Sequence, residues 1–262
     1  MNRVCMTNQL QRKKKGAQPS GNPHGVVVGA DPQMSALYQV STSAALVEGV
    51  YSGSVPSSVL LGHGDFGLGT FEGLEGEMVI LDGQIYQVTG SVRYPTDDFL
   101  VPFAAITYFR TRSSFEIDSV ACLKDIELAC DQQRISENLF YALRLDGLFA
   151  TVHARAVHAV RPNTRLVDAA RTQSAFHFEN VEGTLVGFWS PRYSSSFSVP
   201  GYHLHFISKD RTKGGHLLDC SARKLNARIQ VLSEYSIRLP DSGPFLTIYL
   251  SKDPASELAK TE

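Results

Sequence analysis

The stretch GYHLHFISKDRTKGGH, residues 201–216, holds three histidines whose spacing can make a metal site. Side chains alternate between the two faces of a β-strand, so His203 and His205 point to the same side. The segment that follows is polar and turn-prone, and Gly214-Gly215 relaxes the backbone just before His216. A strand that returns antiparallel would place His216 opposite the pair, so that three imidazoles converge on one point.

Three neutral imidazoles suit zinc and other late first-row divalent ions. They leave coordination positions open, which a catalytic metal needs, whereas a structural zinc normally has four protein ligands. The spacing alone also fits surface histidines that bind no ion. Cys220 lies four residues beyond His216, and we expect it to be a small buried hydrophobic residue rather than a fourth ligand.

The composition bounds the class of protein. The 262 residues are enough for one large domain or two modest ones. The formal net charge of −1 gives no indication of nucleic-acid or membrane binding, and no apolar run is long enough to span a membrane. The four cysteines form no CxxC pair, so we expect free thiols in a reducing, cytoplasmic compartment.

The organisation of the chain predicts a mixed, sheet-rich α/β protein. Residues 1–34 are expected to form a disordered basic tail, in which RKKKG at 12–16 is a solvated segment. An N-terminal α/β lobe is expected over 35–150 and a C-terminal sheet lobe over 151–262, which carries the histidines and ends in a tail or helix. Each lobe would have a mixed or antiparallel sheet with flanking helices, and the metal site would lie near the domain interface.

Local patterns predict individual elements. The spacing of apolar residues across 119–135 predicts a helix. Asp82-Gly83 predicts a two-residue hairpin turn, and we interpret Asp146-Gly147 in the same way. Near the end of the chain, Asp253 followed by Pro254 predicts the start of a short helix.

Several longer segments occur in the order found in one family, and from residue 35 onward the chain resembles acetolactate decarboxylases. The segments are LYQVST (37–42), GHGDFGLGTFEGLEGEM (62–78), NLFYALRLDGLF (138–149), GTLVGF (183–188), GYHLHFI (201–207) and GGH (214–216). The resemblance implies a two-domain α/β metalloenzyme, usually a homodimer, that holds zinc through three histidines. It implies the conversion of acetolactate (2-hydroxy-2-methyl-3-oxobutanoate) to (R)-acetoin and carbon dioxide in acetoin and butanediol biosynthesis, with neither nucleic acid nor membrane as a partner.

The same resemblance implies roles for individual residues. The histidines of the stretch 201–216 match the family's metal ligands in identity and spacing, with one zinc ion expected per chain. Glu77 in EGEM and Arg155 in HARAV match a catalytic glutamate and arginine of the active site, and the arginine also contacts substrate. Thr70 in LGTF matches a threonine near the substrate, and Glu262 in the closing KTE matches a second catalytic glutamate carried by the C-terminal tail.

Taken without the resemblance, these residues have ordinary alternatives. Arg155 sits mid-strand among small and apolar residues, which also fits a structural ion pair, and Arg144 competes with it for the role of anion binder. Glu77 also fits a solvated acid, and its neighbours Glu72 and Glu75 are equally acidic.

Our preferred hypothesis is metal-dependent decarboxylation. A metal at the substrate ketone would stabilise the charge that develops as carbon dioxide leaves. Arg155 would position the carboxylate, while Glu77 and Glu262 would donate and accept a proton, one of them with a raised pKa.

Two alternatives remain open at this point. The first is a cupin-like metal oxygenase or isomerase, because cupins also carry HxH on a strand. Cupins supply a glutamate shortly after the pair, whereas here only Asp210 follows, at a loose spacing. The second is a non-catalytic module that binds a small molecule on the same fold.

Overall fold

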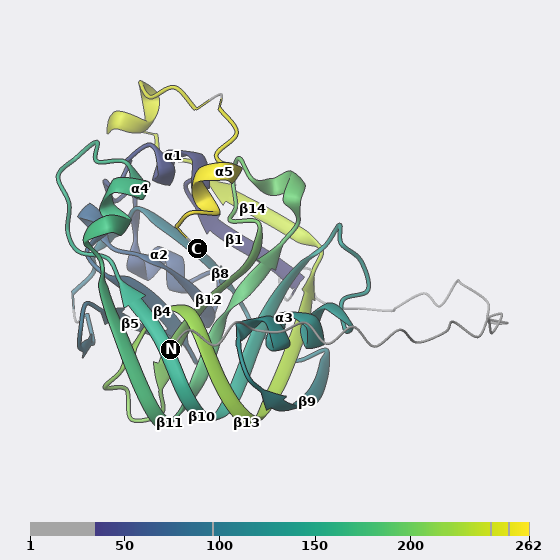
Figure 1. The fold of residues 1–262 in the computed structure, drawn as a ribbon. Coiled ribbons are helices and arrows are strands. Elements are labelled where there is room, and N and C mark those ends of the chain that lie inside the picture. The colour runs from purple at the N-terminus through teal and green to yellow at the C-terminus, as the bar shows by residue number, and fades with distance from the viewer. Residues whose placement is uncertain (1–34, 96, 242, 251, 262) are drawn as a thin grey trace, which may run out of the picture.

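The computed structural model describes residues 35–95, 97–241, 243–250 and 252–261. The predicted basic tail over 1–34 and the predicted site residue Glu262 lie outside these ranges. Within them the chain forms three sheets and a few short helices, which confirms the expected sheet-rich, mixed fold (Figure 1). Among these residues we find no helix with the length and apolar character needed to cross a membrane.

The larger sheet has seven strands in the order β14-β1-β8-β3-β4-β5-β6. Its first pair, β1 and β14, is parallel, and the remaining pairs are antiparallel. The strands are β1 (Ala36–Val40), β3 (Phe66–Thr70), β4 (Glu77–Leu81), β5 (Gln84–Val88), β6 (Val92–Arg93), β8 (Phe103–Thr107) and β14 (Glu234–Arg238). The predicted hairpin at Asp82-Gly83 is confirmed, because both residues have the positive φ (54° and 78°) that a tight two-residue turn needs.

The second sheet has five strands, four of which pair with one another in a closed ring. Strand β10 pairs with β11 along one edge and with β13 along the other, while β12 pairs with both β11 and β13. The fifth strand, β9, pairs with the outer part of β13. The strands are β9 (Ser113–Val120), β10 (Phe140–Ala156), β11 (Ser174–Ser190), β12 (Gly201–Ser208) and β13 (Gly214–Leu232). A third, two-stranded sheet pairs β2 (Val55–Pro56) with β7 (Leu100–Val101).

The predicted hairpin at Asp146-Gly147 is wrong, because β10 runs through both residues as one strand. Asp146 and Gly147 pair with β11 on one side and with β13 on the other. Here the glycine serves close packing rather than a turn, since an added Cβ would lie 2.7 Å from Leu225. The expected lobe boundary at residue 150 falls inside this strand, and β9 and β14 each join the sheet formed by the other half of the chain.

The helices are short. They are α1 (Ser43–Val47), α2 (Ser57–Leu61), α3 (Leu123–Asp131), α4 (Leu166–Ala169) and α5 (Ala255–Leu258), with 3-10 turns η2 (Glu72–Leu74), η3 (Ala170–Thr172), η4 (Arg192–Ser194) and η5 (Gly243–Leu246). The helix predicted over 119–135 is the shorter α3, because the Asp125 carboxylate accepts the N–H groups of residues 121 and 122 and caps its start. The closing helix begins at Ala255, whose N–H is capped by the Asp253 carboxylate at 3.0 Å.

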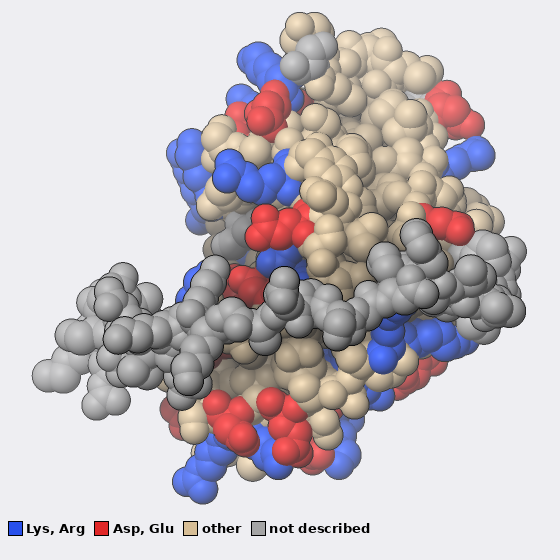
Figure 2. All heavy atoms as spheres, turned by 90° about the vertical axis from the view of Figure 1, so that its right-hand side faces the viewer, with Lys and Arg blue, Asp and Glu red and all other residues tan. Residues whose placement is uncertain are grey.

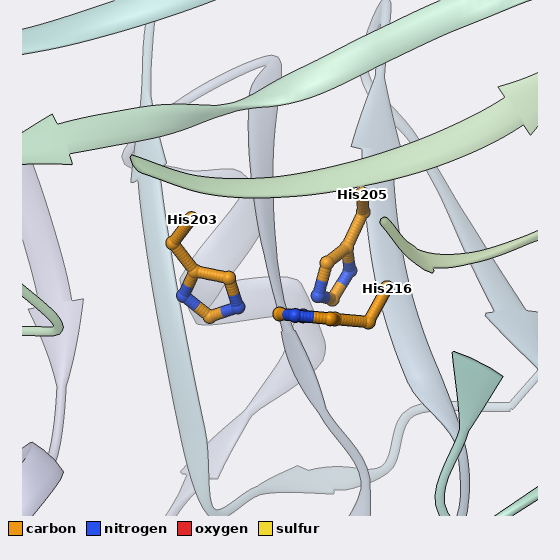
Figure 3. A group of neighbouring side chains, drawn as sticks. All are labelled: His203, His205 and His216. Atoms are coloured by element: carbon orange, nitrogen blue, oxygen red, sulfur yellow. The ribbon is translucent and has the colours of Figure 1, made fainter. Parts of the chain in front are cut away.

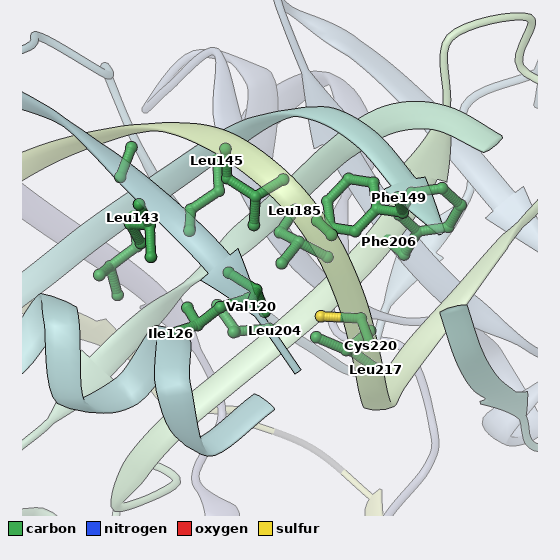
Figure 4. Packing of buried hydrophobic residues seen from close by; sticks show 14 of the residues in the cluster. Val120, Ile126, Leu143, Leu145, Phe149, Leu185, Leu204, Phe206, Leu217 and Cys220 are labelled. Carbon is green, nitrogen blue, oxygen red and sulfur yellow. The ribbon is translucent and has the colours of Figure 1, made fainter. Parts of the chain in front are cut away.

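The two faces of β12 divide the core between them. Leu204 and Phe206 point into the closed part of the five-stranded sheet and pack with Phe149 and Leu185 (Figure 4). Helix α3 covers this cluster through Ile126. The opposite face of β12 turns toward the seven-stranded sheet. Because residues alternate along the strand, the histidines of β12 lie between the two sheets.

The first residues of β13 fix the register on which the site depends. His216 is the register partner of Arg155 on β10 and of His205 on β12. Only glycine fits immediately before it, since an added Cβ on Gly214 would lie 2.8 Å from the Phe206 carbonyl oxygen. On Gly215, whose φ is +147°, it would lie 2.6 Å from the Arg155 carbonyl oxygen. The glycine pair therefore allows β13 to enter between β10 and β12.

We predict that Gly215→Ala lowers the free energy of unfolding by roughly 2–4 kcal/mol and also lowers the metal bound per chain, because the methyl group forces β10 and β13 apart. Gly201→Ala is the matched control. Gly201 also has a positive φ (86°) but open space around it, so we expect a loss of about 1 kcal/mol. Urea titration of both variants measures the difference, and equal losses would contradict the proposed packing constraint.

Candidate metal centre

The three predicted histidines converge. His203 and His205 extend from β12 and His216 from β13, with their rings turned toward one another (Figure 3). One ring nitrogen from each lies within 4.8 Å of the others. His205 and His216 are 1% and 2% exposed, while His203 is partly accessible. The cluster is therefore buried, and its accessible side is at His203.

The hydrogen bonds of His205 identify which of its nitrogens can bind a metal. Its Nδ1–H donates to the backbone carbonyl of Met78 at 2.8 Å, because a carbonyl oxygen can only accept. In the neutral ring Nε2 then carries a lone pair. This nitrogen is buried without a hydrogen-bond partner, and the Glu77 carboxylate lies 3.6 Å away. A buried lone pair beside a carboxylate oxygen is satisfied by a cation, so the donor set fits a divalent metal ion.

Burial keeps the triad neutral. It lowers the pKa of His203 to about 3, with a further contribution from the positive charge of Arg155. Burial also lowers the pKa of His205 and His216 well below the usual value, and the neighbouring imidazoles and Arg155 act in the same direction. At neutral pH all three rings therefore offer lone pairs to a metal without first losing a proton.

Glu77 and Arg155 form a buried ion pair beside the histidines. They are 5% and 7% exposed, and Arg155 Nη1 donates to Glu77 Oε1 at 3.2 Å. The same carboxylate oxygen accepts the backbone N–H of Val157 at 3.4 Å. Arg155 Nη2 donates to the backbone carbonyl of Thr261, near the end of the chain. Each predicted partner is thus fixed by at least one further contact.

A narrow pocket of about 40 Å³ opens onto these groups, with room for only a few water molecules. Its polar wall holds the three histidines, Glu77, Arg155 and Thr70. The Thr70 hydroxyl donates to the Gly76 carbonyl at 2.8 Å, which directs it along its own loop. The apolar wall consists of Leu46, Leu74, Phe103, Val157 and Leu166. The pocket therefore suits a small molecule with one charged or chelating end and one apolar end.

The competing candidates lie elsewhere. Arg144 contacts Asp82 and Asp146 at 2.6 and 3.3 Å, away from the pocket. Glu72 and Glu75 are exposed. The pocket is therefore lined by Arg155 and Glu77, and not by the residues that compete with them in the sequence.

The carboxylate and the thiol near the histidines in sequence also do not join the triad. Asp210 accepts hydrogen bonds from Ser208 and Thr212 within the turn, so it does not act as the carboxylate ligand of a cupin-like site. Cys220 is buried in the hydrophobic core, as expected.

Sequence reasoning missed the roof of the pocket. Leu46 on α1 and Leu166 on α4 line it, and the Thr261 carbonyl reaches Arg155. These residues are ordinary apolar or hydroxyl residues far from the histidines in sequence, and no local pattern marks them. Glu262 lies outside the described residues, but its neighbour Thr261 is in contact with a pocket residue.

Comparison with known proteins decides the family. Residues 37–252 match the family described as Alpha-acetolactate decarboxylase. A protein of that name from Methanosarcina mazei is 47% identical over 229 residues, which cover 86% of this chain and 80% of that protein. The chain belongs to the alpha-acetolactate decarboxylase family. The Bacillus subtilis alpha-acetolactate decarboxylase is 37% identical over 236 residues, covering 88% of this chain and 92% of that protein.

Solved structures agree with this family assignment. The crystal structure of alpha-acetolactate decarboxylase from Bacillus subtilis strain 168 superposes with a TM-score of 0.84 at 37% identity, covering 87% of this chain and 99% of that chain. A Staphylococcus aureus protein of unknown function, similar to alpha-acetolactate decarboxylase, superposes with a TM-score of 0.83 at 31% identity. It covers 87% of this chain and 100% of that chain. The fold described above is therefore the fold of this family.

We predict that the metal-free protein becomes less stable as the pH falls below about 6.5. The unfolded chain then takes up protons on its histidines, whereas the folded triad, with lowered pKa values, does not. The contribution of the neutral imidazoles to the free energy of unfolding is fully present above the pKa of an unfolded histidine. Below that pKa it falls by roughly 1.4 kcal/mol for each buried imidazole and each unit of decreasing pH.

Urea unfolding of metal-free protein at pH 7 and pH 5.5 measures this loss, and His203→Gln should reduce it by about one imidazole's share. An unchanged free energy of unfolding between the two pH values would contradict the burial of neutral imidazoles.

Proposed function

We propose that this protein is a carboxy-lyase that converts acetolactate to (R)-acetoin and carbon dioxide, using one zinc ion held by His203, His205 and His216. The observation that carries the proposal is the buried Nε2 of His205, which faces Glu77 within the triad and lacks a hydrogen-bond partner. Membership of the family supplies the reaction, and the pocket supplies the histidines, a buried ion pair and apolar side chains that suit the chemistry of acetolactate.

The metal would supply positive charge at the substrate oxygens, which favours movement of electrons onto the ketone. Zinc is the preferred ion because three neutral imidazoles form an open catalytic zinc site. The Met78 carbonyl holds the His205 ring in the required tautomer, and burial keeps all three rings unprotonated.

Arg155 supplies the charge that attracts the substrate carboxylate. Its guanidinium lies on the polar wall of the pocket, held from two sides by Glu77 and the Thr261 carbonyl. A guanidinium with fixed direction presents a defined face to an anion. The apolar lining residues would receive the two methyl groups of acetolactate and exclude water from the reacting carbon.

The reaction needs one proton for each carbon dioxide released. The bond between C2 and the carboxylate breaks, its electron pair moves toward the adjacent ketone oxygen, and a proton then adds to C2. Glu77 lies beside the triad. Among the described residues that line the pocket it is the one with a carboxyl group, so we assign it a role in holding or delivering that proton. Glu262 remains the predicted second carboxyl group, and Thr70 the predicted substrate contact. A homodimer and a cytoplasmic location also stay predictions.

Metal removal tests the central requirement. We expect protein stripped with a chelator to form no acetoin from acetolactate, and one equivalent of zinc to restore the activity. His205→Ala should lower kcat/KM at least about a thousandfold, because it removes a ligand and leaves the Met78 carbonyl without its donor. His153→Ala, at an exposed histidine of β10, is the matched control and should behave as the parent protein. Full activity in verified metal-free protein would refute the proposal.

The role of Glu77 is tested by Glu77→Gln, which keeps the size of the side chain but removes its charge and its capacity to accept or release a proton near neutral pH. We expect kcat to fall by roughly 10²–10⁴-fold, the range typical of a lost acid or base. Glu75→Gln, at an exposed carboxylate two residues away, should leave kcat unchanged. The assay follows acetoin formation, and equal rates in the two variants would exclude a proton-transfer role for Glu77.

A further inference from the structure

Three short helices that are far apart in sequence form the roof of the metal pocket. They are α1, α4 and α5, which lie together above the sheets in Figure 1. Leu46 of α1 and Leu166 of α4 line the pocket, and Leu258 of α5 is buried in the same apolar cluster. These apolar side chains thus either line the pocket or pack in the same cluster as the residues that line it.

One arginine joins the polar sides of the three helices. Arg165, which directly precedes α4, places Nη2 2.9 Å from Oε1 of Glu48, at the end of α1. The same nitrogen lies 2.7 and 2.9 Å from the two carboxylate oxygens of Glu257 in α5. A single guanidinium nitrogen therefore bridges carboxylates from two other helices, which makes a network rather than an isolated surface pair.

Helix α5 is linked to the pocket through the residues that follow it at the end of the chain. Four residues after Glu257, the buried Thr261 accepts a hydrogen bond from Arg155 Nη2 through its carbonyl. Arg155 Nη1 in turn donates to Glu77 beside His205. The orientation of the Arg155 guanidinium thus depends on where α5 holds Thr261.

Helix α5 is too short to be stable without its contacts to the rest of the protein. It contains four residues, far fewer than an isolated helix needs to be stable in water. Leu258 is its buried residue, and Glu257 makes its bidentate contact with Arg165. The ion pair is 40% exposed at the arginine and 28% at the glutamate, so its strength is moderate and its loss should be measurable without unfolding the protein.

We propose that Arg165 is a positioning residue for the decarboxylation. It clamps α5 against α1 and α4, which keeps Thr261 on Arg155 and keeps the guanidinium directed into the pocket. The proposal rests on the proposed function for its effect on catalysis. Its structural part, the docking of residues 255–261, is measured independently of activity.

Amide hydrogen exchange tests the docking directly. The N–H groups of residues 258–261 donate to carbonyls within the terminal helix and turn, so they are protected only while this segment is folded. We expect Arg165→Ala to increase their exchange rate roughly three- to tenfold, as loss of a partly exposed ion-pair network implies. Arg165→Lys should be intermediate, because one nitrogen makes all the contacts and an ammonium can replace part of them. Glu257→Gln should act in the same direction as Arg165→Ala.

The matched control is Arg171→Ala. Arg171 lies six residues from Arg165 and makes an exposed ion pair with Asp168 at 2.9 Å, away from α5. It should leave exchange at residues 258–261 unchanged. Bound zinc per chain and the urea midpoint should stay at the parent values in all four variants, which separates loss of the clamp from loss of the metal or the fold.

Kinetics then test positioning. We expect kcat/KM for acetolactate to fall threefold or more in Arg165→Ala, less in Arg165→Lys, and not at all in Arg171→Ala. Unchanged exchange at residues 258–261 in Arg165→Ala, or increased exchange with parent kcat/KM, would overturn the proposal. If the parent protein forms no acetoin, the proposed function fails, while the exchange comparison still decides whether Arg165 holds the terminal segment.

Discussion

The site depends on where one strand enters between two others. His216, at the start of β13, is paired in register with Arg155 on one side and His205 on the other. A shift of one residue would turn His216 to the opposite face and separate it from both partners. The register is held by two glycines that allow close backbone approach and by a long antiparallel ladder between β10 and β13. The three histidines and the arginine are thus placed by backbone geometry alone.

Electrostatics then make this arrangement useful. Burial alone would make three adjacent imidazoles and an ion pair costly, because each buried polar atom needs a partner. The Met78 carbonyl, the Val157 amide and the Thr261 carbonyl supply partners for His205, Glu77 and Arg155. His205 Nε2 is left without one, and it points at the place where a cation would be held. On the face shown in Figure 2, basic and acidic residues are interspersed beside a largely uncharged area.

The sequence predicted those features that depend on short-range geometry. Strand alternation was sufficient to place His203 and His205 on one side, and the turn at Asp82-Gly83 followed from its residue types. The sequence did not reveal that β10 continues through Asp146-Gly147, because glycine in a strand allows close packing as readily as a turn.

Contacts between residues far apart in the chain also could not be predicted from the sequence. The approach of Glu77 to His205, the exchange of β9 and β14 between the two sheets, and the roof built from α1, α4 and α5 all involve residues far apart in the chain. The family resemblance pointed to Glu77 and Arg155 as site residues. The structure adds why they lie together: Arg155 pairs with His216 in register, while β4, which carries Glu77, faces β12 across the two sheets.

The central claim is that His203, His205 and His216 hold a metal ion in the active protein. X-ray diffraction from crystals of zinc-loaded, active protein, recorded on both sides of the zinc absorption edge, tests it most directly. We expect one anomalous peak between the three rings, at about 2.0–2.1 Å from one nitrogen of each, including Nε2 of His205. An active, zinc-containing protein with no anomalous peak at the triad, or with the peak at another group of residues, would contradict it.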